Sequence, residues 1–76
     1  MEKKVIEIIR KVAKIEAEKE IKNSDDLFGD LGIDSLRGLK IMAEIEEEFD
    51  ITIPDDRLSE MNTIKKIVET IKTELE

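Results

Sequence analysis

Apolar residues recur at the helical spacing of about 3.6 residues in three stretches of this chain, and this pattern restricts the fold more than any other feature. It predicts helices over residues 2–19, 35–50 and 64–74. Pro54 and the two aspartates after it predict the start of a shorter helix over 56–61. The only aromatic residues are two phenylalanines, so the core between these helices must be aliphatic. We therefore expect an all-α fold, a small four-helix bundle of three long helices and one short helix.

The segments between these helices are predicted to be a long loop and a short extended connection. Residues 20–34 form a long loop of turn-forming and apolar residues, which we expect to lie over the core, with a short helical turn allowed at Asp25–Phe28. So long a connection is unusual in a small bundle and indicates function. Residues 51–55 resemble a strand, but Pro54 and the lack of a partner strand favour an extended connection. Thr63 is expected to cap the last helix.

Length and composition narrow the classes of protein that fit. A chain of 76 residues is enough for one small domain, expected to span 1–76. No apolar run is long enough to cross a membrane, no signal-peptide pattern is recognisable and no exposed apolar stripe is expected, so we expect a cytoplasmic monomer. Cysteine and histidine are absent, which removes the thiol nucleophile, the usual base of a serine hydrolase and the commonest transition-metal ligand.

No metal site is expected in the chain. The acidic loop suggests calcium, but an EF-hand pattern started at Asp30 needs a glycine at its sixth position and a glutamate at its twelfth. Those positions hold Ser35 and Ile41. Starts at the two earlier aspartates fail as well, because apolar residues then fall at ligand positions.

The net charge of −7 is concentrated in the middle of the chain. Residues 23–62 carry three basic and twelve acidic residues, a net charge of −9. Such a surface disfavours binding to nucleic acid or to an anionic membrane and attracts basic protein partners, although acids also simply keep a small protein soluble. The repulsion within this segment predicts that magnesium or added salt stabilises the fold.

Ser35 stands where the acidic loop gives way to the second predicted helix. The first N–H groups of a helix lack partners within it and the helix dipole is positive there, so a phosphate ester on Ser35 would lie beside free donors. The simpler interpretation makes Ser35 the N-cap, in which case Ser35→Ala would cost about 1 kcal/mol of stability and have no other effect. Farther along, Gly38 is unfavourable in a helix interior, which indicates either tolerance or a group that approaches the backbone closely.

The stretch Gly32–Leu36, with the sequence Gly-Ile-Asp-Ser-Leu, resembles the hallmark of the acyl carrier proteins. That hallmark is a glycine, an apolar residue and then Asp-Ser-Leu, with the serine carrying phosphopantetheine. Glu46–Asp50 and Ile53–Asp55 resemble the end of the family's second helix and the loop that follows it. With the helix spacing and the total length, the resemblance covers nearly the whole chain.

The resemblance implies a covalent 4′-phosphopantetheine cofactor on Ser35. A separate phosphopantetheinyl transferase would attach it from coenzyme A with magnesium, and Asp34 would be the acid that assists the metal-bound transfer complex. The arm ends in a thiol, so a chain without cysteine could carry acyl groups as thioesters. The chain itself would be no enzyme: it would tether the acyl group and present it to acyl-transfer, fatty acid, lipid or related biosynthetic enzymes at a raised effective concentration.

The resemblance also implies two further sets of residues on and near the second helix. The family usually has acids at or near two exposed positions of this helix, which here hold the basic residues Arg37 and Lys40. This difference indicates either neutral drift or a specialised carrier with partners outside housekeeping fatty acid synthesis. The expected partner-binding residues are Leu36, Arg37, Lys40, Glu44, Glu47 and Glu48. The core residues that are also expected to line an acyl cavity between the second and third helices are Ile41, Ile45, Phe49, Leu58, Met61 and Ile64.

Three alternatives stay open at this point. A carrier of aminoacyl, peptidyl or polyketide cargo would use the same arm, and only the acidic surface and the small size favour a free-standing acyl carrier. An unmodified helical protein-interaction domain would need Ser35 only as a cap. An enzyme is the weakest alternative, because Asp34 is the only base visible near Ser35.

Overall fold

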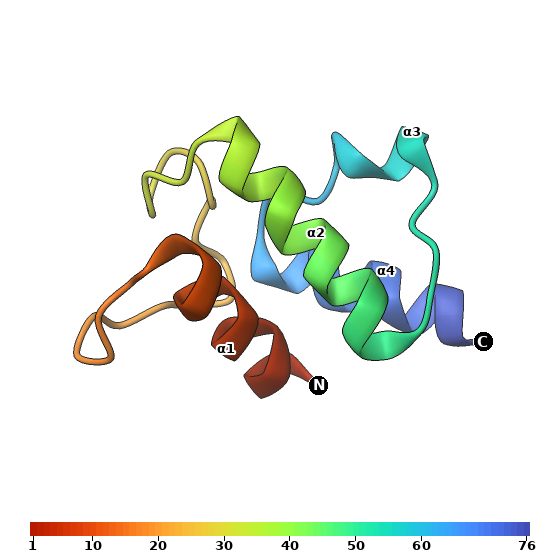
Figure 1. The fold of residues 1–76 in the computed structure, drawn as a ribbon, viewed down its shortest axis with the longest axis horizontal. Coiled ribbons are helices and arrows are strands. Elements are labelled where there is room, and N and C mark those ends of the chain that lie inside the picture. Colours follow the sequence, from red (N-terminus) through yellow and green to blue (C-terminus); the bar gives the residue numbers. More distant parts are fainter.

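The computed structural model describes residues 1–76 and contains four helices (Figure 1). They are α1 (Glu2–Ala13), α2 (Ser35–Phe49), α3 (Asp55–Leu58) and α4 (Ile64–Leu75). Helix α1 packs against both α2 and α4, while α3 is a single short turn near the start of the chain's return to α4. The predicted all-α bundle of three long helices and one short helix is confirmed. None of these helices is both long enough and apolar enough to cross a membrane.

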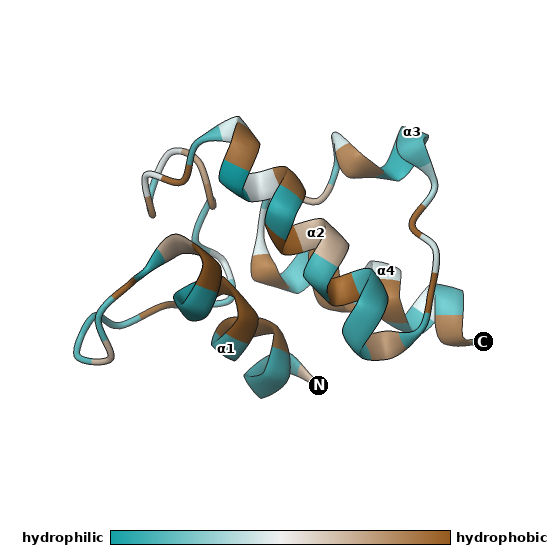
Figure 2. Ribbon diagram, viewed as in Figure 1, coloured by the Kyte–Doolittle hydropathy of each residue, from teal (hydrophilic) through white to brown (hydrophobic).

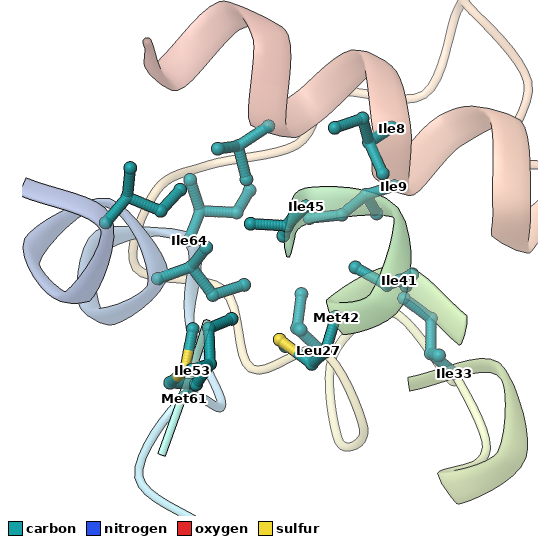
Figure 3. Close-up of a cluster of buried hydrophobic side chains, with 13 residues drawn as sticks. Ile8, Ile9, Leu27, Ile33, Ile41, Met42, Ile45, Ile53, Met61 and Ile64 are labelled. Atoms are coloured by element: carbon teal, nitrogen blue, oxygen red, sulfur yellow. The ribbon is translucent and has the colours of Figure 1, made fainter. Parts of the chain in front are cut away.

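The core is one cluster of thirteen buried apolar side chains drawn from the three long helices and the loops between them (Figure 3). Figure 2 shows how apolar and polar bands alternate along α1 and α2, as expected for helices with one buried face. Most of the cluster is isoleucine, whose branched side chain has few rotamers and so packs in a defined way. The members are Val5, Ile8, Ile9, Leu27, Ile33, Ile41, Met42, Ile45, Ile53, Met61, Ile64, Ile67 and Ile71.

Helix α1 ends at Ala13, so the prediction that it continues to residue 19 is wrong. Lys14 adopts a left-handed conformation, with φ 56° and ψ 44°, and its N–H donates to the carbonyl of Arg10. This arrangement closes the helix end. The Arg10 guanidinium then donates to the carbonyls of Glu16 at 2.7 Å and Lys19 at 2.8 Å, which folds the following residues back toward the helix. The long loop is therefore longer than predicted.

The connection from α1 to α2 lies over the core, as predicted, because Leu27 and Ile33 are buried in it. The N–H of Leu27 donates to the carbonyl of Asn62 at 2.8 Å, beside an isolated β-bridge between Asp26 and Thr63. These bonds tie the loop to the start of α4 although the two segments are far apart in the sequence.

The helical turn allowed at Asp25–Phe28 does not form as a helix. Instead the N–H of Asp30 donates to the carbonyl of Asp26 at 2.9 Å, so a single turn closes slightly later in the chain. The Asp26 carboxylate accepts the N–H groups inside this turn and thereby replaces the bonds that a continuing helix would supply.

The connection from α2 to α4 is extended up to Pro54, as predicted, and buries Ile53. The carboxylate of Glu46 accepts the N–H of Ile53 at 2.8 Å, which fixes this segment against α2. Helix α3 stops at Leu58 rather than at residue 61. The residues after it form tighter turns, in which N–H groups donate to the carbonyls three residues earlier, and Met61 is buried in the core. The predicted cap of the last helix is confirmed: the Thr63 hydroxyl accepts the N–H of Lys66 at 3.2 Å.

Candidate functional site

Ser35 is the first residue of α2 and is exposed. The N-cap of α2 is its neighbour Asp34, whose Oδ1 accepts the N–H of Arg37 at 2.8 Å. The interpretation of Ser35 as the N-cap is therefore wrong. Because a carboxylate already fills that position, the hydroxyl of Ser35 is not needed as a cap and is available for a role outside the helix.

The two residues before Asp34 set the direction in which the chain enters α2. Gly32 has φ +67° and open space around the position where a Cβ would lie, so the conformation, and not crowding, favours glycine there. Ile33 is buried, and its N–H donates to the carbonyl of Leu27 at 2.9 Å. With Ile33 anchored in the core, Asp34 and Ser35 are held at a fixed place on the surface.

An apolar groove with a volume of about 260 Å³ begins at Ser35. Its walls come from α2, from the end of α3 with the residues just after it, and from one residue of the long loop. The groove is large enough to receive a slender apolar group, and five of its eight lining residues are hydrophobic. The lining residues are Phe28, Ser35, Gly38, Leu39, Met42, Leu58, Ser59 and Met61.

Gly38 supports this groove through a close contact with Phe28. A Cβ at position 38 would lie 3.1 Å from Cε1 and 3.3 Å from Cζ of the Phe28 ring, which is tighter than ordinary van der Waals contact. The ring therefore lies directly on the backbone of α2. Of the two interpretations of Gly38 drawn from the sequence, the structure supports the close approach.

The turn that carries Phe28 is held by the carboxylate of Asp26. Hydrogen bonds from the N–H of Gly29 at 3.0 Å and the N–H of Phe28 at 2.8 Å hold the pKa of Asp26 below its usual range. The amide of Asn62 and the charge of Lys66 act in the same direction, whereas partial burial opposes them. An ionised Asp26 thus stabilises the segment that forms one wall of the groove.

Comparison with known proteins decides the family. Residues 3–71 match the family model described as a phosphopantetheine attachment site. An acyl carrier protein from Buchnera aphidicola is 41% identical over 71 residues, which cover 93% of this chain and 89% of that protein. An acyl carrier protein from Porphyromonas gingivalis is 35% identical over 75 residues, covering 99% and 95%. The chain belongs to the acyl carrier protein family.

The fold agrees with this membership. A protein from Mycobacterium tuberculosis assigned as an acyl carrier protein superposes with a TM-score of 0.85 at 25% identity, over 95% of each chain. The predictions of the family and of phosphopantetheine as cofactor are confirmed. So is the carrier function, which separates this chain from the unmodified interaction domain considered above. The family is one of carriers and not of catalysts.

The predicted partner-binding residues nearest Ser35 lie on the exposed side of α2. Leu36 is 78% exposed, and Lys40 is exposed as well. Arg37 is also exposed, but its Nη1 donates to the carbonyl of Ala13 at 3.3 Å and so contacts the end of α1. Leu39, which was not among the predicted partner-binding residues, is 59% exposed and continues the same apolar surface into the groove. The expectation that no apolar stripe is exposed is therefore wrong at this end of α2.

The acidic members of the predicted set lie farther along α2. The Glu44 side chain is only 35% exposed and pairs with Lys11 of α1 at 3.7 Å, so part of its charge is used within the molecule. Glu47 and Glu48 are exposed and contribute to the negative surface near the end of the helix. The structure thus separates the predicted partner residues into an apolar and basic end beside Ser35 and an acidic end away from it.

The residues expected to line an acyl cavity fall into two groups. Leu58 and Met61 line the groove, as a cavity role requires. Ile41, Ile45 and Ile64 are completely buried in the core, and Phe49 packs on the core from the last turn of α2. The groove residues not anticipated are Phe28, Gly38, Leu39, Met42 and Ser59, of which only the unfavourable Gly38 gave a signal in the sequence.

The residues around Ser35 fit a phosphopantetheine arm. The hydroxyl that would form the phosphodiester is exposed and lies in the first turn of α2, where helix N–H groups favour a negative phosphate. The groove that begins at the same residue offers apolar walls to whatever the arm carries. An exposed hydroxyl at a helix start and an apolar groove therefore meet at Ser35.

Proposed function

We propose that this chain is a free-standing acyl carrier protein, a single domain over 1–76, whose 4′-phosphopantetheine arm is attached to Oγ of Ser35. The observation that carries the proposal is the position of Ser35: it is exposed, is relieved of capping by Asp34, and opens into an apolar groove. Ser59 is also exposed and lines the groove, but it lies at the end of α3 and not at a helix start, and Ser24 lies in the long loop outside the groove.

The residues of the chain position and shelter the cargo. When attached, the arm supplies the thiol that carries an acyl group as a thioester. Gly32 and Ile33 hold the loop so that Ser35 faces outward, and Asp34 uses Oδ1 as the helix cap. Its second carboxylate oxygen would assist the magnesium of the transfer complex. The groove walls exclude water from an apolar cargo and favour acyl groups over charged aminoacyl or peptidyl groups.

The same proposal extends to partners and location. A phosphopantetheinyl transferase and acyl-transfer or biosynthetic enzymes of fatty acid or lipid metabolism would approach the exposed part of α2 beside Ser35, where Leu36 and Leu39 offer an apolar contact. Lys40 gives this contact a positive charge that distinguishes it from the acidic surface around it. We therefore propose a specialised carrier, acting as a cytoplasmic monomer, whose partners recognise a basic residue at this position.

An intact-mass measurement tests the attachment. The protein is weighed before and after incubation with coenzyme A, magnesium and a broad-specificity phosphopantetheinyl transferase. We expect a single added arm in the wild type and in Ser59→Ala, a matched control because Ser59 lines the same groove, and no addition in Ser35→Ala. Addition to Ser35→Ala, or no addition to a folded and previously unmodified wild type, would overturn the proposal.

A further inference from the structure

We propose that Phe28 is a specificity-determining residue of this carrier: its ring, lying on Gly38, closes one side of the groove and limits the length of acyl chain that the groove shelters. The inference rests on the proposed function, because it requires an acyl group held at Ser35. Phe28 is the only residue of the long loop among the groove walls, which otherwise come from α2 and from the region of α3.

The ring reaches this position because residue 38 has no side chain. With any larger residue, the Cβ would lie 3.1 Å from Cε1 of Phe28, so the ring would have to move. Gly38 is buried although Leu39 beside it is exposed, which shows how closely the ring covers the helix backbone. Glycine weakens the interior of a helix, and this contact gives it a structural role.

The backbone beneath the ring is fixed by hydrogen bonds, whereas the ring itself is partly exposed to solvent. Leu27 is buried and donates its N–H to Asn62, and the N–H of Phe28 is held by Asp26. The Phe28 side chain is nevertheless 45% exposed. An exposed side chain on a fixed backbone can change rotamer without moving its loop. Phe28 therefore acts as a movable wall of the groove and not as part of the core.

Two of the other wall residues are less able to make room. Met42 and Met61 are buried and belong to the core cluster. An acyl chain too long for the groove of about 260 Å³ must displace the ring or extend into water. Each methylene group moved from water into apolar surroundings favours the sheltered state by about fourfold. Sheltering should thus increase with chain length until the groove is full and then stop increasing.

The test uses the arm-loaded protein acylated with straight-chain groups of increasing length. Loading at Ser35 is first verified by intact mass. The rate of thioester cleavage by hydroxylamine is then measured, because a sheltered thioester reacts more slowly. In the wild type we expect this rate to fall by up to about fourfold per added methylene, to a break length beyond which it no longer falls. Phe28→Ala should move the break to longer chains.

Two further variants make the result decisive. Phe28→Leu, with a smaller apolar side chain, should give an intermediate break and stands in if Phe28→Ala does not fold. Leu75→Ala removes an apolar side chain that is also about half exposed (53%) but lies at the end of α4, and it should not move the break. An unchanged break in both Phe28 variants of a loaded, folded protein would overturn this inference alone. Failure to load Ser35 would overturn the proposed function and this inference with it.

Discussion

At the scale of single residues, the start of α2 divides two tasks between neighbours. Asp34 caps the helix by accepting the N–H of Arg37, and Ser35 keeps an exposed hydroxyl. A serine that served as the cap would have its oxygen engaged with a backbone N–H. The division leaves the oxygen that would form a phosphodiester free, without weakening the helix that presents it.

This division predicts the effect of removing each side chain. Ser35→Ala should leave the free energy of unfolding within about 0.5 kcal/mol of the wild type, whereas Asp34→Ala should lower it by about 1 kcal/mol. Asp34→Asn is the matched control, since its amide oxygen can still accept the N–H of Arg37. Urea unfolding of the apo proteins measures all three. A loss of about 1 kcal/mol in Ser35→Ala would contradict the assignment of the cap.

The two basic residues of α2 differ in their surroundings, and this decides how partner recognition is best tested. Arg37 donates to the carbonyl of Ala13, so its replacement also removes a contact with the end of α1. Lys40 is exposed and takes part in neither of the two ion pairs of the molecule. Lys40 is therefore the cleaner probe of the proposed specialisation.

We expect Lys40→Glu to raise turnover by ordinary fatty acid synthase enzymes by up to about tenfold at low ionic strength, because it restores an acid where basic enzymes dock. The double variant Arg37→Asp with Lys40→Glu should act in the same direction but with a lower melting temperature. Lys65→Glu makes the same charge change on α4 and should have no such effect. Equal rates for wild type and both α2 variants, across several such enzymes, would favour neutral drift.

At the scale of elements, the site depends on a loop that is held by individual hydrogen bonds more than by secondary structure. The Asp26 carboxylate accepts two N–H groups of the turn that carries Phe28, and Gly32 supplies the left-handed residue before α2. Each of these residues fixes the backbone of a short stretch of the loop between the core and Ser35. Changes there should alter the site while leaving the helices in place.

The lowered pKa of Asp26 predicts a loss of stability in acid. Since the pKa is lower in the folded than in the unfolded protein, the contribution is complete above about pH 4, the unfolded value, and is lost as the pH falls through the folded value. Asp26→Asn keeps an acceptor oxygen but cannot titrate there. Unfolding free energies measured from neutral pH into acid should therefore fall less steeply for Asp26→Asn. Identical slopes for the two proteins would contradict the assignment.

The two loop glycines provide a matched pair. Gly32→Ala should lower the free energy of unfolding by roughly 1–2 kcal/mol, because φ +67° is strained for a residue with a Cβ. Gly29→Ala should be tolerated, since its added Cβ would meet no atom closer than 3.8 Å. Chemical unfolding of both variants measures the difference. If both alanine variants lost the same stability, backbone strain at Gly32 would not be the cause.

At the scale of the whole molecule, a small aliphatic core opposes a concentrated negative charge. The molecule measures 33 × 21 × 20 Å, and one cluster of thirteen buried side chains holds it together. The central residues 23–62 carry a net charge of −9, and among their acidic residues only Glu44 forms an ion pair with a base. Repulsion among the remaining acids lowers the stability of the compact state, most strongly at low ionic strength.

Magnesium and added salt should consequently raise the melting temperature. Because the carboxylates are spread over the surface, screening by sodium chloride should achieve most of the effect, and magnesium should achieve it at lower concentration. Thermal unfolding in low-salt buffer, with and without each salt, measures the shift. Adding sucrose, which carries no charge, controls for a general solute effect. A melting temperature that neither salt changes would show that repulsion is unimportant.

The local pattern of the sequence determined the helices, the cap of α4 and the family. Apolar spacing identified α1, α2 and α4, and Pro54 with the aspartates after it identified α3, because a helix is built from hydrogen bonds between residues close in sequence. The cap at Thr63 followed from the same local rules. The motif Gly32–Leu36 located the candidate attachment site because its residues are consecutive.

Tertiary structure decided where α1 ends and which apolar residues face the groove. At the stop after Ala13, Lys14 adopts a left-handed conformation and Arg10 donates to carbonyls in the following loop, neither of which helix periodicity registers. Ile41 and Met42 are neighbouring buried apolar residues, yet only Met42 lines the groove, because packing against the loop and the α3 region determines which face of α2 the groove follows. The contact of Phe28 with Gly38 joins two segments that no local rule connects. Long-range packing therefore shaped the site that the local motif had located.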